Sequence, residues 1–120
     1  MTRKLTGNEL LRFREVPEWA REIILEAVDQ HHVALRDVLA SGRSQQAVIA
    51  RDHAIYRLRT KMPEKPSTMQ IGDWIGLDHS SVCVALARHS ERTGAKLVTT
   101  SDIAARRRRH REYWQMRKAA

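Results

Sequence analysis

Apolar residues recur at helical spacing along most of this chain, and no stretch alternates between apolar and polar positions as a half-buried strand does. The clearest stretch begins at Pro17, a residue suited to the first position of a helix. Glu18 and Glu22 follow it, where the helix dipole favours acidic side chains. The pattern predicts a helix from about Pro17 to Gln30, whose buried stripe comprises Ile23, Ile24, Ala27 and Val28.

The next two helices are predicted from their ends. A short helix contains Leu35, Val38 and Leu39 and ends at Ser41-Gly42. Ser44 is a good N-cap for a longer helix that runs to about Lys61, before Pro63 and Pro66 open a loop. The inner face predicted for this longer helix carries Val48, Ile49, Ala54, Ile55 and Leu58.

Two more helices complete the predicted bundle. Ser67 and Gln70 have the spacing of a capping box, which starts a helix that ends near Ile75. The following helix runs from about His79 to His89, and Thr93-Gly94 ends it. Its buried positions are predicted to be Val82, Ala85 and Leu86.

The two ends of the chain differ from the middle. Residues 1–15 are polar apart from a short apolar patch of Leu10, Leu11 and Phe13, and this pattern is compatible with a frayed helix. Residues 95–100 have the composition of a linker, after which Thr100 or Ser101 caps a last helix that is rich in arginine. The chain is therefore divided into a polar segment (1–16), a helical domain (17–94) and a linker with a basic helix or tail (95–120). The expected fold is all-α, a compact bundle of five to six helices with a basic C-terminal extension.

The segment Ile71-Gly72-Asp73-Trp74-Ile75-Gly76-Leu77-Asp78-His79-Ser80-Ser81-Val82 is the most informative in the chain. An apolar half-turn ends at Gly76, and small polar side chains open a second apolar-periodic run shortly after it. Such a pattern is typical of a helix-turn-helix, in which the second helix presents hydrogen-bonding groups to base edges.

Charge agrees with this interpretation. The 120 residues carry a formal net charge of +8, which favours polyanionic partners such as nucleic acid. No leader-like segment and no apolar run long enough to cross a membrane occurs, and the single cysteine, Cys83, has no partner for an internal disulfide. We therefore expect a cytoplasmic, nucleoid-associated protein without membrane contact.

Three ordered pieces of the chain resemble the C-terminal DNA-binding domain of the bacterial replication initiator DnaA. They are Val38-Leu39-Ala40-Ser41-Gly42-Arg43-Ser44, Ala50-Arg51-Asp52-His53-Ala54-Ile55-Tyr56-Arg57-Leu58, and the segment from Ile71 to Val82 with its Asp-His-Ser-Ser-Val signature. The resemblance covers residues from about Glu22 to His89. The phosphate-binding motif of that family's ATPase module is missing, so the chain is expected to recognise DNA without hydrolysing ATP.

The resemblance implies roles for particular residues. Asp78, His79, Ser80 and Ser81 would open a recognition helix in the major groove, and Ala85 would let that helix approach a thymine methyl group. Asp78 and Ser80 are also suited to plain N-capping, which does not rule out DNA contact. The full set predicted to contact double-stranded DNA is Arg43, Ser44, Arg51, Asp78, His79, Ser80, Ser81, Ala85, Arg88 and, in the C-terminal run, Arg106, Arg107, Arg108 and Arg109.

The sequence departs from the family pattern at three places. Leu77 stands where an arginine usually precedes Asp-His, and the turn is one residue shorter. Asp52 places a carboxylate where it would repel a nearby phosphate, and Gln45 and Gln46 make the basic loop less cationic. We expect weaker binding from the core domain and a target other than the family's usual DnaA box.

The sequence leaves two other functions open. Seven of the fourteen acidic residues precede position 41, so the N-terminal helix offers a surface for another protein or a second copy of the chain. The alternative function is thus an adaptor that modulates the replication initiator, and a weaker one is nonspecific nucleic-acid binding by the arginine run. His31 and His32 are adjacent rather than three or four residues apart, and no histidine has a cysteine or carboxylate at ligand spacing. No metal, cofactor or enzymatic activity is expected.

Overall fold

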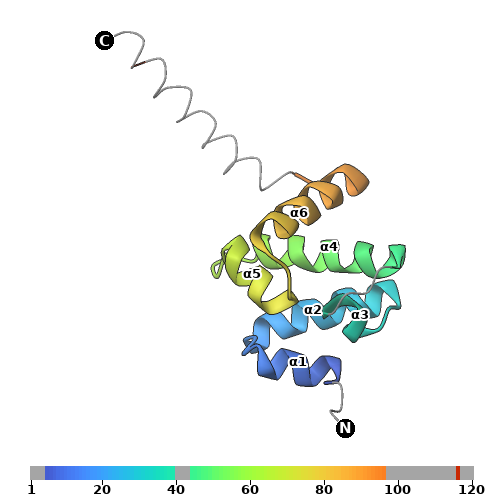
Figure 1. Ribbon diagram of the computed structural model, residues 1–120. Helices are drawn as coiled ribbons and strands as arrows, with labels where there is room; N and C mark the ends of the chain where they lie inside the picture. Colours follow the sequence, from blue (N-terminus) through green and yellow to red (C-terminus); the bar gives the residue numbers. More distant parts are fainter. Residues whose placement is uncertain (1–4, 40–43, 97–115, 117–120) are drawn as a thin grey trace.

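The computed structural model describes residues 5–39, 44–96 and 116, and within these it contains six helices and no strand (Figure 1). The helices are α1 (Gly7–Phe13), α2 (Glu18–His31), α3 (Leu35–Leu39), α4 (Gln45–Thr60), α5 (Thr68–Ile75) and α6 (His79–Thr93). The predicted all-α class is confirmed. None of the helices in the described ranges is both long and apolar enough to span a membrane.

Side-chain caps begin four of the six helices in the described ranges, and the sequence predicts two of these caps, Ser44 and Ser67. The hydroxyl groups of Ser44 and Ser67 accept hydrogen bonds from the backbone N–H groups of Ala47 and Gln70, both at 3.1 Å. Pro17 is the N-cap of α2 and lies just outside the helix rather than in its first position. Gly94 ends α6 in the left-handed conformation, with φ of 74°. Local chemistry therefore fixes these boundaries to within one or two residues.

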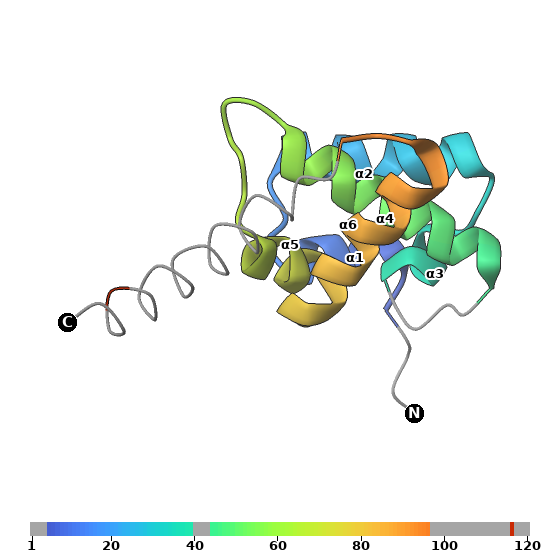
Figure 2. The ribbon, with the colours of Figure 1, turned by 90° about the horizontal axis from the view of Figure 1, so that it is seen from above.

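Helix α4 lies between α2 and α6, and α6 crosses over it when the bundle is seen from above (Figures 1 and 2). Alanines at 47, 50 and 54 are fully buried on α4, which allows the neighbouring helices to approach closely. The inner face differs in phase from the predicted one, because Val48 and Ile49 are only half-buried. The buried positions of α4 are Ala47, Ala50, Arg51, Asp52, Ala54, Ile55 and Leu58.

The N-terminal segment belongs to this bundle and is not a frayed extension of it. Thr6 and Glu9 form a complete capping box at the start of α1, and Leu11 is buried in the common core. Gly7 packs so closely on α3 that a Cβ atom there would lie 2.6 Å from Cγ of Leu35. Helix α1 therefore shares a core with the domain predicted to begin at residue 17. The basic helix predicted in the C-terminal part lies outside the described residues.

A three-residue turn, Gly76-Leu77-Asp78, joins α5 to α6. Gly76 has φ of 92°, and the N–H groups of Gly76 and Leu77 both donate to the carbonyl of Gly72, at 2.7 and 2.9 Å. Arg14, which follows α1, donates to the carbonyl of Trp74 at 3.1 Å and lies against Gly76. The turn is closed so tightly that a Cβ atom on Gly72 would lie 2.4 Å from the carbonyl oxygen of Leu77.

This contact makes Gly72 a sensitive position. We expect Gly72→Ala to lower the free energy of unfolding by about 1–3 kcal/mol, because backbone atoms must shift to admit the methyl group. The neighbouring exposed residue provides the control, since Asp73→Ala is expected to change stability by less than about 0.5 kcal/mol. Urea unfolding followed by circular dichroism measures both, and equal stability of the two variants would contradict the tight turn.

Candidate nucleic-acid interface

The first turn of α6 is organised by Asp78, which is its N-cap. The carboxylate accepts a hydrogen bond from the backbone N–H of Ser81 at 2.7 Å. Hydrogen bonds from the hydroxyl and then from the backbone N–H of Ser81 lower the pKa of Asp78 below its ordinary value. Capping is thus established for Asp78, and Ser81 is its partner. Both were also predicted to contact DNA, and this stays a prediction.

His79 is tied to α5 although it is exposed. Its Nδ1 lies 2.6 Å from the hydroxyl oxygen of Thr68, the first residue of α5 and itself buried. Its Nε2 lies 3.8 Å from Sγ of Cys83, one helical turn further along α6. The bond to Thr68 fixes the ring at the junction of the two helices, on the same turn as Ser80.

The outward face of α6 is defined by the positions opposite its core residues Val82, Ala85, Leu86 and His89. Ala85 is fully buried, which corrects the expectation that it approaches a thymine methyl group. The small apolar side chains that face outward are instead those of Val84, which is 52% exposed, and Ala87. The exposed residues of this outward face are Ser80, Val84, Ala87, Arg88 and Glu91.

Val84 and Ala87 are absent from the predicted set, although helical spacing contains the signal for both. With Val82 and Leu86 directed inward, residues two or five positions away from them point to solvent. The family resemblance singles out Ala85 and not its exposed neighbours. The outward face follows from periodicity once the buried stripe of α6 is known.

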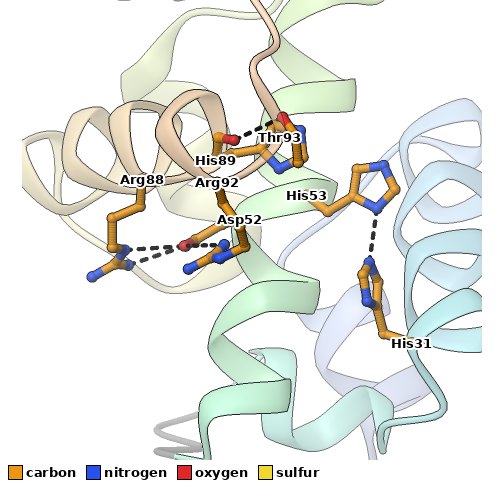
Figure 3. A network of polar contacts seen from close by, with 7 residues as sticks. All are labelled: His31, Asp52, His53, Arg88, His89, Arg92 and Thr93. Carbon is orange, nitrogen blue, oxygen red and sulfur yellow. Dashed lines mark hydrogen bonds and ion pairs between the residues drawn. The ribbon is translucent and has the colours of Figure 1, made fainter.

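Asp52 of α4 is completely buried and is paired with two arginines of α6 (Figure 3). Nε and Nη2 of Arg88 donate to its two carboxylate oxygens, both at 3.0 Å, and Nη1 of Arg92 lies 3.5 Å from Oδ2. The hydrogen bonds to Asp52 raise the pKa of Arg88 above its ordinary value. The expectation that Asp52 repels phosphate is corrected, because its charge is buried and compensated.

Arg51, the preceding residue, is also buried. Its Nε donates to the carbonyl of Val38 at 2.8 Å, and its Nη2 donates to the carbonyl of Asp37 at 2.7 Å. Burial lowers the pKa of Arg51 below its ordinary value. The guanidinium therefore satisfies carbonyl groups of the short α3, which have no partner within that helix. Arg51 was predicted to contact DNA, and the structure places it inside the fold.

The remaining predicted residues are divided between the start of α4 and undescribed segments. Ser44 is exposed, and its hydroxyl caps α4. Arg43 and the run from Arg106 to Arg109 lie outside the described residues. The structure thus places five of the predicted residues on α6. Asp78 caps the helix, His79, Ser80 and Ser81 form its first turn, and Arg88 lies further along it.

Three histidines from different helices meet beside the Asp52 network, a proximity that the sequence spacing did not reveal (Figure 3). Nε2 of His31 and Nδ1 of His53 are 2.9 Å apart, and the ring of His53 stacks on that of His89. In the part of the chain that the structure describes, no group of three or more histidine, cysteine or carboxylate side chains is placed to hold a metal ion. The rings instead join α2, α4 and α6.

No protein-family model, no curated protein and no solved structure matches this chain.

The ion pair on Asp52 leads to a prediction about stability. We expect Arg88→Ala to lower the free energy of unfolding by about 3 kcal/mol, because the longer contact to Arg92 is then the one ion pair left to this buried carboxylate among the described residues. Adding Asp52→Asn should recover part of this loss, since the uncompensated charge is then absent. Urea unfolding of the unaltered protein, the two single variants and the double variant measures the coupling between Arg88 and Asp52.

Arg12→Ala is the matched control. It removes the same side chain from an exposed position on α1 and should change stability by less than about 0.5 kcal/mol. Equal effects of Arg12→Ala and Arg88→Ala would show that the buried pair contributes nothing.

Proposed function

We propose that this protein binds double-stranded DNA in a sequence-specific manner through the outward face of α6, as a stand-alone relative of the DNA-reading domain of DnaA. The observation that carries the proposal is the exposure of Ser80, Val84, Ala87 and Arg88 on a helix that directly follows a three-residue turn. Its use would be transcriptional control or the modulation of replication initiation.

The side chains of this face are suited to a major groove, which is wide enough to admit a helix. The Ser80 hydroxyl can donate to or accept from a base edge or a phosphate, and Val84 offers the apolar contact that a thymine methyl group prefers. Ala87 is small enough to let the helix approach the bases closely. Arg88 keeps a side chain that is 44% exposed beside its bond to Asp52, so it can reach a phosphate. Glu91 lies one turn beyond Ala87 and marks the end of the surface that can approach phosphate.

The distribution of charge also supports this face. Helix α2, which has four exposed carboxylates, lies on the other side of α4 from α6 and is not part of the proposed surface (Figure 1). These carboxylates are Glu18, Glu22, Glu26 and Asp29. Asp52, the one carboxylate in the sequence of α4, is neutralised from α6. The net charge of +8 favours a polyanionic partner for the chain as a whole, and it comes from residues outside the described ranges, because the described residues hold twelve basic and twelve acidic side chains.

Leu77 argues for a target that differs from the DnaA box. It replaces the arginine that usually precedes the Asp-His pair in that family, and it is packed against the core rather than free to reach a base. The burial of Arg51 removes a second cationic contact. Base readout would therefore fall to the α6 side chains from Ser80 to Arg88.

Selection of double-stranded DNA from a random pool at near-physiological salt tests the proposal. We expect enrichment of one motif, and Ser80→Ala and Val84→Ala should each weaken binding to it by about 1–3 kcal/mol for every base that the side chain reads. Ala87→Glu should abolish enrichment, because it places a larger, negatively charged side chain on the same surface.

Two controls separate this face from the rest of the bundle. Leu25→Ala shortens an exposed aliphatic side chain on α2, and Arg12→Glu introduces a carboxylate at an exposed position on α1. Both variants should select the same motif as the unaltered protein. Enrichment that survives all three α6 substitutions unchanged would exclude α6 as the reading helix.

The arginine run makes a separate contribution in this proposal. Changing Arg107 and Arg108 to glutamine should lower affinity for all sequences alike, because phosphate contacts carry no sequence information. The salt dependence of binding should also become shallower, by about 0.9 in the logarithmic slope for each phosphate that is no longer neutralised. Titrations at several salt concentrations, with selected and scrambled duplexes, measure both effects. A weakening confined to the selected duplex would contradict a role in phosphate binding.

The acidic face of α2 favours a second candidate function, the binding of a basic protein. Leu25 is 40% exposed on this acidic helix. Its side chain lines a pocket together with Val28, His32 and Val33. This is the surface expected of an adaptor that modulates the replication initiator. The same selection experiment distinguishes the two functions, because an adaptor without DNA affinity would enrich no sequence.

A further inference from the structure

His31, His53 and His89 form a cluster, the histidine cluster, where α2, α4 and α6 meet. Nε2 of His31 and Nδ1 of His53 are 2.9 Å apart, so one ring donates to the other. The rings of His53 and His89 are nearly parallel, with an interplanar angle of 5° and centroids 5.2 Å apart. Tyr56 contacts the ring of His89, with centroids 4.7 Å apart. A single group of contacting rings therefore connects the three helices.

The cluster is accessible to solvent protons. A pocket of about 390 Å³ opens beside it and is lined by the three histidines together with Arg92 and Thr93 of α6. His31 and His53 are half-buried, whereas His89 is buried. Protonation therefore does not require the whole protein to unfold first.

The charges around the cluster oppose further positive charge. Arg57 of α4 acts on His53, and Arg92 of α6 acts on His89. Asp52 acts in the opposite direction on His89, but it is already paired with Arg88 and Arg92. Glu26 of α2 is 2.6 Å from Arg57 and is paired with it. Both carboxylates are thus already engaged with arginines when a new imidazolium forms.

Protonation also removes contacts within the cluster. When Nδ1 of His53 carries a proton, it can no longer accept a hydrogen bond from Nε2 of His31, so this contact must reverse its direction or break. A second charge on the stacked pair would place like charges about 5 Å apart in a partly desolvated site. Burial is the largest cause that lowers the pKa of both His53 and His89, and neighbouring positive charge adds to it.

The C-terminal half of α6 depends on this region. The apolar anchors of α6 are Val82, Ala85 and Leu86, and beyond Leu86 the only buried residue of this fully described helix is His89. The last two turns are thus held by His89 and by the arginine contacts to Asp52, and not by apolar burial.

We propose that His31, His53 and His89 form an acid-sensitive latch that holds the C-terminal half of α6 on α2 and α4 while His53 and His89 are neutral and releases it when these two rings are protonated. The latch does not depend on the proposed DNA binding. Its contribution to stability is complete above the ordinary imidazole pKa of 6.5 and is lost as the pH falls below that value. The reason is that the unfolded chain then binds more protons than the folded one.

The first test measures the unfolding equilibrium constant at several pH values. For each imidazole that resists protonation in the fold, the unfolding equilibrium constant rises up to tenfold per pH unit below 6.5. Between roughly pH 7.5 and 5.0, we expect the unfolding equilibrium constant to rise more for the unaltered protein than for the double variant His53→Asn/His89→Phe. The difference between the two rises should be at least about tenfold. Asparagine retains a group that can bond His31, and phenylalanine retains a ring beside Tyr56. Exposed His32 provides the control, His32→Asn, which should keep the full pH dependence.

Hydrogen exchange on the unaltered protein provides a second test that does not depend on whether a variant folds. Protection factors of the amides from Leu86 to Thr93 should fall below pH 6.5, while those from Ile71 to Ile75 in α5 are retained. A uniform loss of protection in all helices would overturn the latch. So would a double variant with the same pH dependence as the unaltered protein.

Discussion

The packing of α4 between α2 and α6 is the constraint on which the other features depend. Helix α4 buries three alanines, so the neighbouring helices can lie close to it, but it also buries Arg51 and Asp52. A buried charge is costly unless it is paired and hydrogen-bonded. Each of these residues therefore requires a particular neighbour: Arg51 takes two backbone carbonyls of α3, and Asp52 takes Arg88 and Arg92 of α6. The two charges fix the positions of α3 and α6 along α4.

Much of the fold could be predicted because its signals are local. Ser44, Ser67 and Gly94 begin or end helices through contacts within a few residues, and the structure confirms them. The phase of α4 could not be predicted, because Ala47 is buried while the more apolar Val48 beside it is only half-buried. Which of the two residues is buried depends on the helices that pack against α4, and these are far away in the sequence. The polar N-terminal segment likewise contains no local sign that its apolar residues complete the core.

In the candidate site too, the features set by local contacts could be predicted, and those set by distant partners could not. Capping by Asp78 follows from its place before a helical run, whereas the positions of Arg51 and Asp52 depend on partners 13 to 40 residues away. A resemblance to a family assigns such residues by position, but position does not say whether a charge faces solvent. For these two residues burial reverses the interpretation. The carboxylate expected to repel DNA is neutralised, and the arginine expected to attract it is enclosed.

Helix α6 consequently has two ends that are held by different forces. Its crossing with α4 is polar, because Asp52 and His53 face Arg88 and His89 (Figure 3). The residues that anchor its start lie in the apolar core. Apolar packing is nearly insensitive to pH, whereas ion pairs and imidazoles respond to both pH and salt. The first turns, which carry Ser80, are anchored by apolar packing that solution conditions barely affect, although the Asp78 cap and the bond between His79 and Thr68 add polar contacts there. The last turns are held by contacts that respond to pH and salt. A change in either would therefore displace Arg88 before it disturbed the turn between α5 and α6.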